Sequence, residues 1–356
     1  MAQTINSACN AGYSFLPIEG EKNMAVTCVR SSALDGWQRF MSSQGYRTES
    51  MKPFQNFAQA DAEAERRIPL RGFVDFSECV VRDTKDVAIP WLVGRNYSLQ
   101  SLGPVGDAVC ASTSVGSALR RFVEYFALLQ DCTDIRIDSQ ERTTSLSYRI
   151  LDPNIWPRHQ DAMFSFGILA QILCQGSTDG WDQVEFHFEA SASMMTGDIQ
   201  RVVDAPCSFE ADTNMFRFPT RFLDRAIEPC DRAAPINELN RQIADKNRSS
   251  ALVERLAQVV YRDLDQLGID QERVAREVGM SSRTMRRHLA TEGHSFQQVL
   301  DECRMRQAVF EFRTKPDLSI AQIALRLGYS EHSTFTRAFR RWSGVSPQAC
   351  RKQMAQ

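Results

Sequence analysis

The spacing of apolar residues differs between the front and the rear of the chain. Apolar and polar residues alternate over residues 135–150 and 184–188, which is typical of strands with one buried face. After Ser249 the apolar residues recur three and four positions apart, for example over residues 320–327, so they share one face of a helix. The pattern predicts an α+β domain followed by an all-α domain.

The front part combines both kinds of element. Its alternating stretch predicts two strands that turn near residues 139–143, and helical spacing appears over residues 116–129 and 162–174. A segment rich in proline, asparagine and charged residues follows it. We therefore expect an α+β regulatory domain over residues 1–228, a linker over 229–248 and a helical domain over 249–356.

The rear part contains the same helical unit twice. In each copy a short amphipathic helix ends at a glycine turn, Gly279 or Gly328, and we expect a serine, Ser281 or Ser330, to cap the second helix. A helix, a tight glycine turn and a second helix form a helix-turn-helix unit. The apolar residues between the units mark one face of a long helix over 296–310. We therefore predict two helix-turn-helix units joined by a long helix.

Charge is divided unevenly along the chain. The formal net charge is only -2, but residues 246–356 contain 19 Lys+Arg and 12 Asp+Glu. The rear part is therefore net positive and the front part net negative, which favours a polyanionic partner for the rear part alone.

The second helix of each unit carries basic and polar residues on its outward face. A helix of this size fits the major groove of DNA, where arginine can pair with guanine and shorter polar side chains can reach other bases. A single exposed arginine is usually only solvated, and Arg287 could instead pair with Glu277 or Glu292. Basic faces at the same place in both units favour DNA binding. The expected phosphate contacts, which set position without reading sequence, are Ser282, Arg304, Arg306, Lys315, Arg340 and Arg341.

Common catalytic and targeting signatures are not found. The sequence contains no P-loop, G-x-G-x-x-G, G-x-S-x-G or H-E-x-x-H motif, and its ten cysteines include no C-x-x-C pair. We expect no enzyme, no metal site and no cofactor. Residues 1–20 do not read as a signal peptide, and the apolar stretch 163–174 is too short to span a bilayer. We therefore expect a cytoplasmic protein that does not contact membrane.

Residues 273–352 closely resemble the DNA-binding domain of the AraC/XylS family of bacterial regulators. The matching residues are Val274-Ala275, Gly279–Ser281, Arg283, Met285, Arg287 and Leu289 in the first unit, and Ile323-Ala324, Leu327–Tyr329, Ser333, Phe335, Arg337, Ala338-Phe339 and Gly344–Pro347 in the second. The resemblance implies that the two second helices enter successive major grooves. The positions that match base-reading residues of the family are Arg283, Arg286, Arg287, His332, Ser333, Thr336 and Arg337.

The front part resembles the arabinose-binding-type effector module of some of these regulators, over residues 101–129 and 207–225. This resemblance does not identify arabinose as the ligand. It implies an effector-responsive activator of a nearby metabolic operon that binds promoter DNA, RNA polymerase and an unidentified small molecule, and that can form a homodimer. Aromatic residues of the front part could line a pocket or simply fill a core, so the effector-binding residues are unknown.

Two other functions are compatible with parts of the pattern. The front domain could serve only for dimerisation, which would make the protein a constitutive regulator. Alternatively, the chain could be a DNA-repair enzyme of the alkyl-transfer type fused to a helix-turn-helix domain. That chemistry requires an activated cysteine, typically in a four-cysteine zinc cluster, and the scattered cysteines argue against it.

Overall fold

The computed structural model describes six parts of the chain and divides them into two compact units. The first unit comprises residues 27–150 and 155–245, and the second comprises 151–154 and 246–354, within the described ranges. The first contains helices and sheets and the second is helical, so the predicted fold class is confirmed. The described ranges are 27–58, 67–193, 195, 199–231, 234–264 and 269–354.

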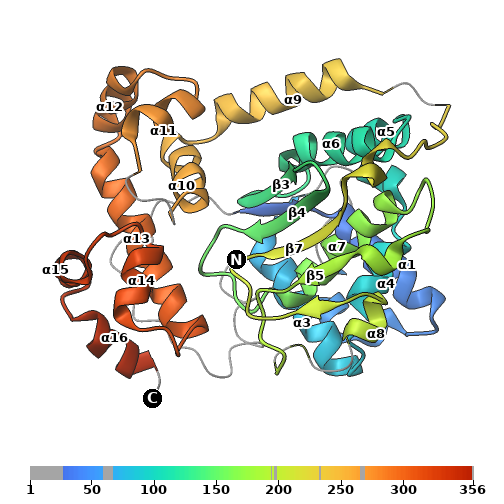
Figure 1. Ribbon diagram of the computed structural model, residues 1–356, viewed down its shortest axis with the longest axis horizontal. Helices are drawn as coiled ribbons and strands as arrows, with labels where there is room; N and C mark the ends of the chain where they lie inside the picture. Colours follow the sequence, from blue (N-terminus) through green and yellow to red (C-terminus); the bar gives the residue numbers. More distant parts are fainter. Residues whose placement is uncertain are drawn as a thin grey trace. The chain divides into compact units, whose positions relative to one another are not determined.

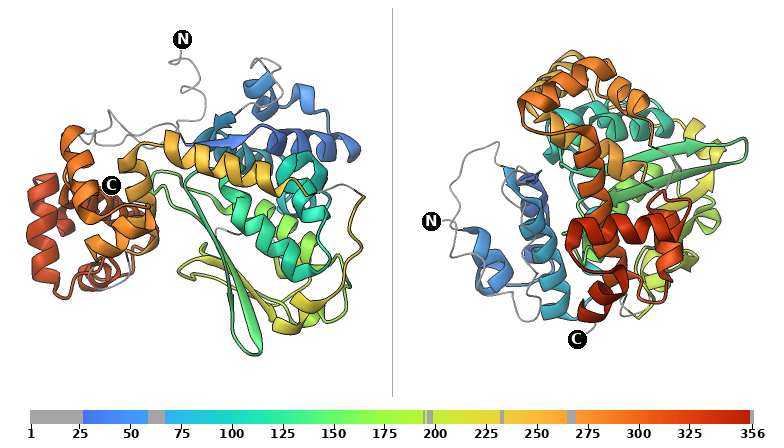
Figure 2. Two further views of the ribbon diagram at one scale, coloured as in Figure 1. Left: turned by 90° about the horizontal axis from the view of Figure 1, so that it is seen from above. Right: turned by 90° about the vertical axis from the view of Figure 1, so that its left-hand side faces the viewer.

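A five-stranded sheet forms one layer of the first unit (Figure 1). The order is β3-β4-β7-β5-β6, and neighbours are antiparallel except for β5 and β6. The predicted hairpin is present as β3 and β4, which Figure 2 shows extending beyond the helices of this unit. The strands are β3 (Thr133–Ser139), β4 (Thr143–Ile150), β5 (Glu185–His187), β6 (Cys207–Ser208) and β7 (Asn214–Pro219).

Helix α7 (His159–Leu173) is the central helix of the first unit. Every residue in it except Gln171 is buried, which explains the long apolar stretch in the sequence. Helix α4 (Ile89–Arg95) packs so closely on it that a Cβ atom added to Gly94 would lie 2.8 Å from the Cα of Gly167. Within the described residues, no helix is both long and apolar enough to cross a membrane.

The remaining elements of the first unit surround this core. A short two-stranded sheet pairs β1 with β2. The elements are β1 (Cys28–Arg30), α1 (Ser32–Ser43), α2 (Lys52–Ala58), β2 (Arg67–Pro69), α3 (Leu70–Thr84), α5 (Pro104–Cys110), α6 (Val115–Tyr125) and α8 (Ile199–Val203).

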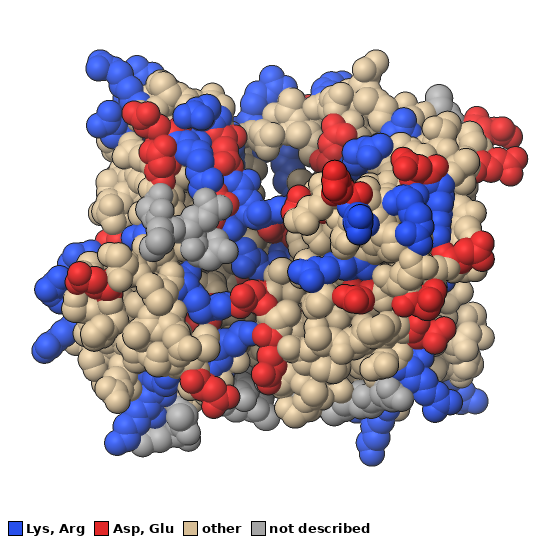
Figure 3. Space-filling model, viewed as in Figure 1, with Lys and Arg blue, Asp and Glu red and all other residues tan. Residues whose placement is uncertain are grey.

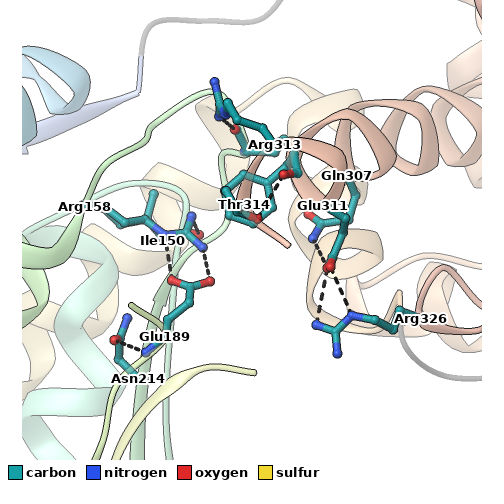
Figure 4. Close-up of polar contacts among 11 residues, drawn as sticks. Ile150, Arg158, Glu189, Asn214, Gln307, Glu311, Arg313, Thr314 and Arg326 are labelled. Carbon is teal, nitrogen blue, oxygen red and sulfur yellow. Dashed lines mark hydrogen bonds and ion pairs between the residues drawn. The ribbon is translucent and has the colours of Figure 1, made fainter. Parts of the chain in front are cut away.

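A buried ion pair ties α7 to the sheet (Figure 4). Arg158, just before α7, donates to both carboxylate oxygens of Glu189 at 3.0 and 2.6 Å. It also donates to the carbonyl oxygen of Ile150 at 2.6 Å, and the Glu189 amide donates to Asn214 Oδ1 at 2.9 Å. The paired charges are therefore largely satisfied by hydrogen bonds, as buried charges must be.

Helix α9 (Ile236–Ser249) occupies much of the segment that the sequence analysis assigned to a linker. Leu239 is fully buried in the core of the first unit. Beside it, the hydroxyl of Tyr125 on α6 donates to Asn240 Oδ1 at 2.9 Å. The first half of α9 is thus a packed element of the first unit.

Seven helices make up the described second unit. Helix α13 runs between the α11–α12 pair and the α14–α15 pair (Figure 1), as the predicted connecting helix would. The helices are α10 (Leu252–Arg262), α11 (Gln271–Glu277), α12 (Ser282–Thr291), α13 (Phe296–Thr314), α14 (Ile320–Arg326), α15 (His332–Ser343) and α16 (Pro347–Met354).

Candidate nucleic-acid interface

The first helix-turn-helix unit consists of α11, a turn at Gly279 and α12. Gly279 has a φ of +77°, a left-handed conformation that glycine adopts without the steric penalty of a side chain. Ser281 caps α12, because its side chain accepts a hydrogen bond from the Thr284 amide at 3.2 Å. Met285 and Leu289 are fully buried, so the opposite face of α12 is directed outward.

Three arginines occupy the exposed face of α12. Arg283, Arg286 and Arg287 are all exposed, and the described structure contains no ion pair for any of them. The carboxylate of Glu277, one of the two candidate partners of Arg287, is held by Arg262 instead. These guanidinium groups are therefore available to an external anion.

The second helix-turn-helix unit repeats this arrangement with α14, a turn at Gly328 and α15. Gly328 also has a φ of +77°, and Ser319 forms a capping box with Gln322 at the start of α14. The prediction that Ser330 caps α15 is wrong. Helix α15 begins at His332 with Glu331 in the cap position and no side-chain cap, because the extended residue before the helix lies one position later than Ser330.

The predicted base-reading residues of α15 lie on its solvent side. His332, Ser333 and Arg337 are exposed and Thr336 is half-buried. Arg337 donates to Thr334 Oγ1 at 3.4 Å, a weak contact within the same helix. Phe335 and Phe339 are fully buried, and they fix the rotation of the helix so that the polar face points outward.

Four of the predicted phosphate contacts remain accessible to different degrees. Arg340 is exposed, and Arg341 is exposed while also pairing with Asp301 at 2.9 Å. Ser282 in the first turn of α12 and Lys315 after α13 are half-buried.

Arg304 and Arg306, two of the predicted phosphate contacts, are largely buried and already have partners within the protein. Arg304 is 9% exposed, donates to the carbonyl oxygen of Leu327 at 3.1 Å and lies over the ring of Tyr329. The Arg306 side chain is 11% exposed and pairs with Glu302 at 2.5 Å. Both side chains lie in the interior of the second compact unit, because other helices pack around α13 and leave little of its surface exposed.

Two ionic networks that the sequence analysis missed brace the helix-turn-helix units. Glu311 on α13 accepts hydrogen bonds from Arg326 on α14 and from Gln307 (Figure 4). Near the first helix-turn-helix unit, the carboxylate of Asp263 accepts hydrogen bonds from Arg262 at 3.0 Å and from Arg273 at 2.8 Å. These partners are up to 15 residues apart in sequence, so no local spacing signal points to them.

Exposed arginines lie on both second helices of the helix-turn-helix repeat, three on α12 and three on α15. Figure 3 shows Lys and Arg side chains clustered over α12 and over α15. These are the two helices that the repeated motif predicts to bind DNA, and their outward faces carry the same sign of charge.

Comparison with known proteins identifies both parts of the chain. The model of the N-terminal arabinose-binding domain of AraC transcription regulators matches residues 57–227, and a helix-turn-helix domain model matches residues 274–353. The HTH-type transcriptional regulator VirS of Mycobacterium tuberculosis (strain CDC 1551 / Oshkosh) is 32% identical over 291 residues, which span 79% of this chain and 84% of VirS. The chain belongs to the AraC family.

This AraC-family protein is a DNA-binding transcription regulator, as the sequence analysis predicted. Two Pseudomonas aeruginosa proteins are 24% identical to it. The match to the ornithine utilization regulator spans 79% of this chain and 84% of that regulator. The match to the HTH-type transcriptional regulator VqsM spans 83% of this chain and 94% of VqsM. The crystal structure of CdpR from Pseudomonas aeruginosa has 19% identity and a TM-score of 0.40, over 90% of this chain and 98% of CdpR.

Proposed function

We propose that this regulator reads two successive major grooves, with α12 in one and α15 in the next. The observation that carries the proposal is the repetition of an exposed basic helix face in two helix-turn-helix units joined by α13. Because α13 connects the units as a continuous helix, it limits the spacing at which the two faces can meet DNA.

Position on the two helices separates base readers from phosphate contacts in this proposal. We assign base reading to the outward residues of the two helices, and phosphate contact to residues at their ends and flanks. The proposed base readers are Arg283, Arg286, Arg287, His332, Ser333, Thr336 and Arg337. The proposed phosphate contacts are Ser282, Lys315, Arg340 and Arg341.

The first unit, in this proposal, binds a small-molecule effector and changes the output of the second. The match to an arabinose-binding domain model supports a ligand-binding role, and the relative named for ornithine utilization supports control of a metabolic operon. We further propose activation through contact with RNA polymerase, and a homodimer. An effector acts in this way only if it binds one arrangement of the protein more tightly than another.

The DNA-binding proposal is tested by selecting bound sequences from random DNA with the full-length protein, followed by footprinting. We expect protection over two adjacent major grooves, about one helical turn apart. The matched control is Arg276→Ala, an exposed arginine on α11 outside both reading faces. Protection of a single groove, or equal loss of selection in the control and in Arg286→Ala, would contradict the proposal.

The effector proposal is tested by measuring DNA affinity and promoter output with and without a panel of metabolites. A ligand of the folded state raises the melting temperature, so the same panel is scored by thermal melts. A regulator whose front unit only dimerises gives no shift with any compound and constant output. Promoter output that falls when the protein is supplied would overturn activation.

A further inference from the structure

Strand β3 is an outer strand of the five-stranded sheet, and β4 is its only neighbour among the described strands. At the end of this hairpin the Gln140 amide donates to the Thr143 carbonyl oxygen at 3.0 Å. Bonded and non-bonded residue pairs alternate along an antiparallel ladder, so the amide and carbonyl groups of Ile135, Ile137 and Ser139 are directed away from β4. These outward groups have no hydrogen-bond partner in the part of the chain that the structure describes.

The free edge of β3 lacks most of the features that usually prevent edge pairing. Proteins protect such edges with proline, with bulges, with very short strands or with charged side chains. Strand β3 has seven residues without proline, and its register with β4 is uninterrupted over all of them. The hairpin extends beyond the helices of the first unit (Figure 2), and Ile135 and Ile137 are only half-buried. Only its charged side chains remain as a possible protection.

Three charged residues, Asp134, Arg136 and Asp138, share one face of β3. Arg136 is exposed and pairs with Asp134 at 2.7 Å. Asp138 is exposed and forms no ion pair within the described chain. A second copy of the chain that pairs antiparallel with β3 presents the same charges in reversed order. The register of such a pair therefore decides whether like or opposite charges meet.

A register centred on Arg136 brings like charges together. It places Arg136 opposite Arg136 of the second copy, and Asp134 opposite Asp138 of the second copy. Like charges directly opposite each other destabilise a sheet. This register is therefore disfavoured at each charged pair.

A register centred on Ile135 is blocked by another strand. It places Ser139 of the second copy opposite Asp131. That position is already occupied by β1, because the Asp131 amide donates to the Cys28 carbonyl oxygen at 2.8 Å. The edge that is open to a second copy therefore begins after residue 131.

A register centred on Ile137 satisfies both the backbone and the charges. It places Ile135 opposite Ser139 of the second copy, so the outward amide and carbonyl groups of β3 receive partners. Arg136 lies opposite Asp138 of the second copy, and the two-fold axis repeats this pair. Both are non-bonded pairs, whose Cα atoms are only about 4.5 Å apart. The free edge of β3 is thus complementary to itself.

We propose that β3 pairs antiparallel with β3 of a second copy of this chain, in the register centred on Ile137. The two five-stranded sheets then form one continuous sheet. This inference rests on the proposed homodimer, and it adds the surface and the residues through which the two copies bind.

The test measures the monomer–dimer equilibrium of the full-length protein by sedimentation velocity over a concentration series without DNA. Asp138→Arg leaves only positive charges at the two paired positions, and Arg136→Asp leaves only negative ones. We expect each variant alone to weaken the dimer by about 10-fold or more, because two like-charge pairs replace two opposite-charge pairs. An equimolar mixture of the two variants should regain the dimer, since its two chains carry opposite charges.

Further variants separate edge pairing from a loss of folding. Asp182→Arg, at an exposed position before β5, is the matched control and should leave the dimer unchanged. Ile137→Pro removes only an amide that points away from β4, which an edge strand tolerates, and it should also weaken the dimer. Thermal melts should show that all variants fold as the wild type does.

The outcomes distinguish the edge from the homodimer itself. A wild-type dimer that both charge variants leave unchanged, or that their mixture fails to restore, overturns the edge pairing and leaves the proposed homodimer standing. A wild-type protein that stays monomeric over the whole concentration series overturns both. Selection of DNA by the same protein then still tests the proposed reading of two grooves.

Discussion

At the scale of single residues, burial divides the arginines of the second unit into two roles. Arg283 and Arg337 are exposed on the outward faces of α12 and α15, where a guanidinium group can pair with a base edge. Arg304 is buried and bonded to a backbone carbonyl oxygen, where the same group holds two helices together. The sequence contains the same residue type in both places, and only the surroundings separate the roles.

Replacing an outward arginine should affect DNA recognition and leave stability unchanged. We expect Arg286→Ala or Arg337→Ala to cost about 1–3 kcal/mol of binding free energy at the selected site and to relax base preference at one position. Binding titrations against the selected site and single-base variants measure this. Arg276→Ala should bind with unchanged preference, and an identical loss in all three variants would contradict the assignment.

Replacing Arg304 should affect stability instead. Arg304→Ala leaves the carbonyl group of Leu327 without its donor, which we expect to lower the free energy of unfolding by about 1–3 kcal/mol. The salt dependence of DNA binding should keep its slope, because no phosphate contact is lost. The exposed Arg340→Ala is the opposite case, with unchanged stability and a shallower slope. A shallower slope for Arg304→Ala would restore the phosphate role.

The raised pKa of Glu78 makes the stability of the first unit depend on pH. The folded state binds the proton more tightly than the unfolded state, since the pKa rises from 4.5 to about 7. Stability from this group is complete below pH 4.5 and is lost as the pH rises through about 7. Glu78→Gln has no such proton, so its thermal melts over this range should decline less than those of the wild type. Parallel declines would refute the shift.

At the scale of elements, capping distinguishes two helices that look alike in sequence. Both α12 and α15 follow a glycine turn and a serine, but only Ser281 caps its helix. The register of α15 places Glu331 in the cap position, so Ser330 lies one residue outside it. Local sequence indicates that a helix starts here, but it does not fix the residue at which α15 begins.

Serine substitutions test this difference. We expect Ser281→Ala to cost about 0.5–2 kcal/mol, the usual range for a lost side-chain cap. Ser330→Ala should change the free energy of unfolding by less, because its side chain is not the cap of α15. Denaturant unfolding of the two variants measures the difference. Equal costs would mean that Ser330 caps the helix in solution.

At the scale of the whole molecule, the chain forms two compact units with separate cores. Leu239 is fully buried in the core of the first unit, while Leu256 is fully buried in the second. Such units can unfold as separate cooperative transitions, in which case a single melting temperature does not describe the protein. The first half of α9 is packed into the first unit, so we expect it to unfold with that unit.

Core truncations should act on one transition at a time. We expect Leu239→Ala and Leu256→Ala each to destabilise one unit by about 2–5 kcal/mol, the usual cost of a cavity left by leucine. Differential scanning calorimetry should show two transitions, with the first variant lowering one and the second lowering the other. A single transition that both variants lower equally would show that the units unfold together.

Much of the fold and part of the site follow from local pattern. Helical spacing, glycine turns and basic faces identified both helix-turn-helix units, and alternation identified the β3–β4 hairpin, because these features are set within a few turns of chain. The roles of Arg304 and Arg306 could not be predicted in this way. They depend on which face of α13 is covered by α14 and α10, and residues far apart in sequence decide that.

The sequence by itself determined the division into α+β and helical parts, the repeated DNA-binding unit and its family, since periodicity and short motifs carry that information. The tertiary structure alone decided which arginines remain free, where α15 begins and that α9 packs into the first unit. It also brought Glu78 on α3 to the first turn of α7, where its carboxylate accepts a hydrogen bond from the Gln160 amide. Burial and ion pairing of side chains arise only when distant segments meet. They decide whether a charged side chain stabilises the fold or stays available to bind a ligand.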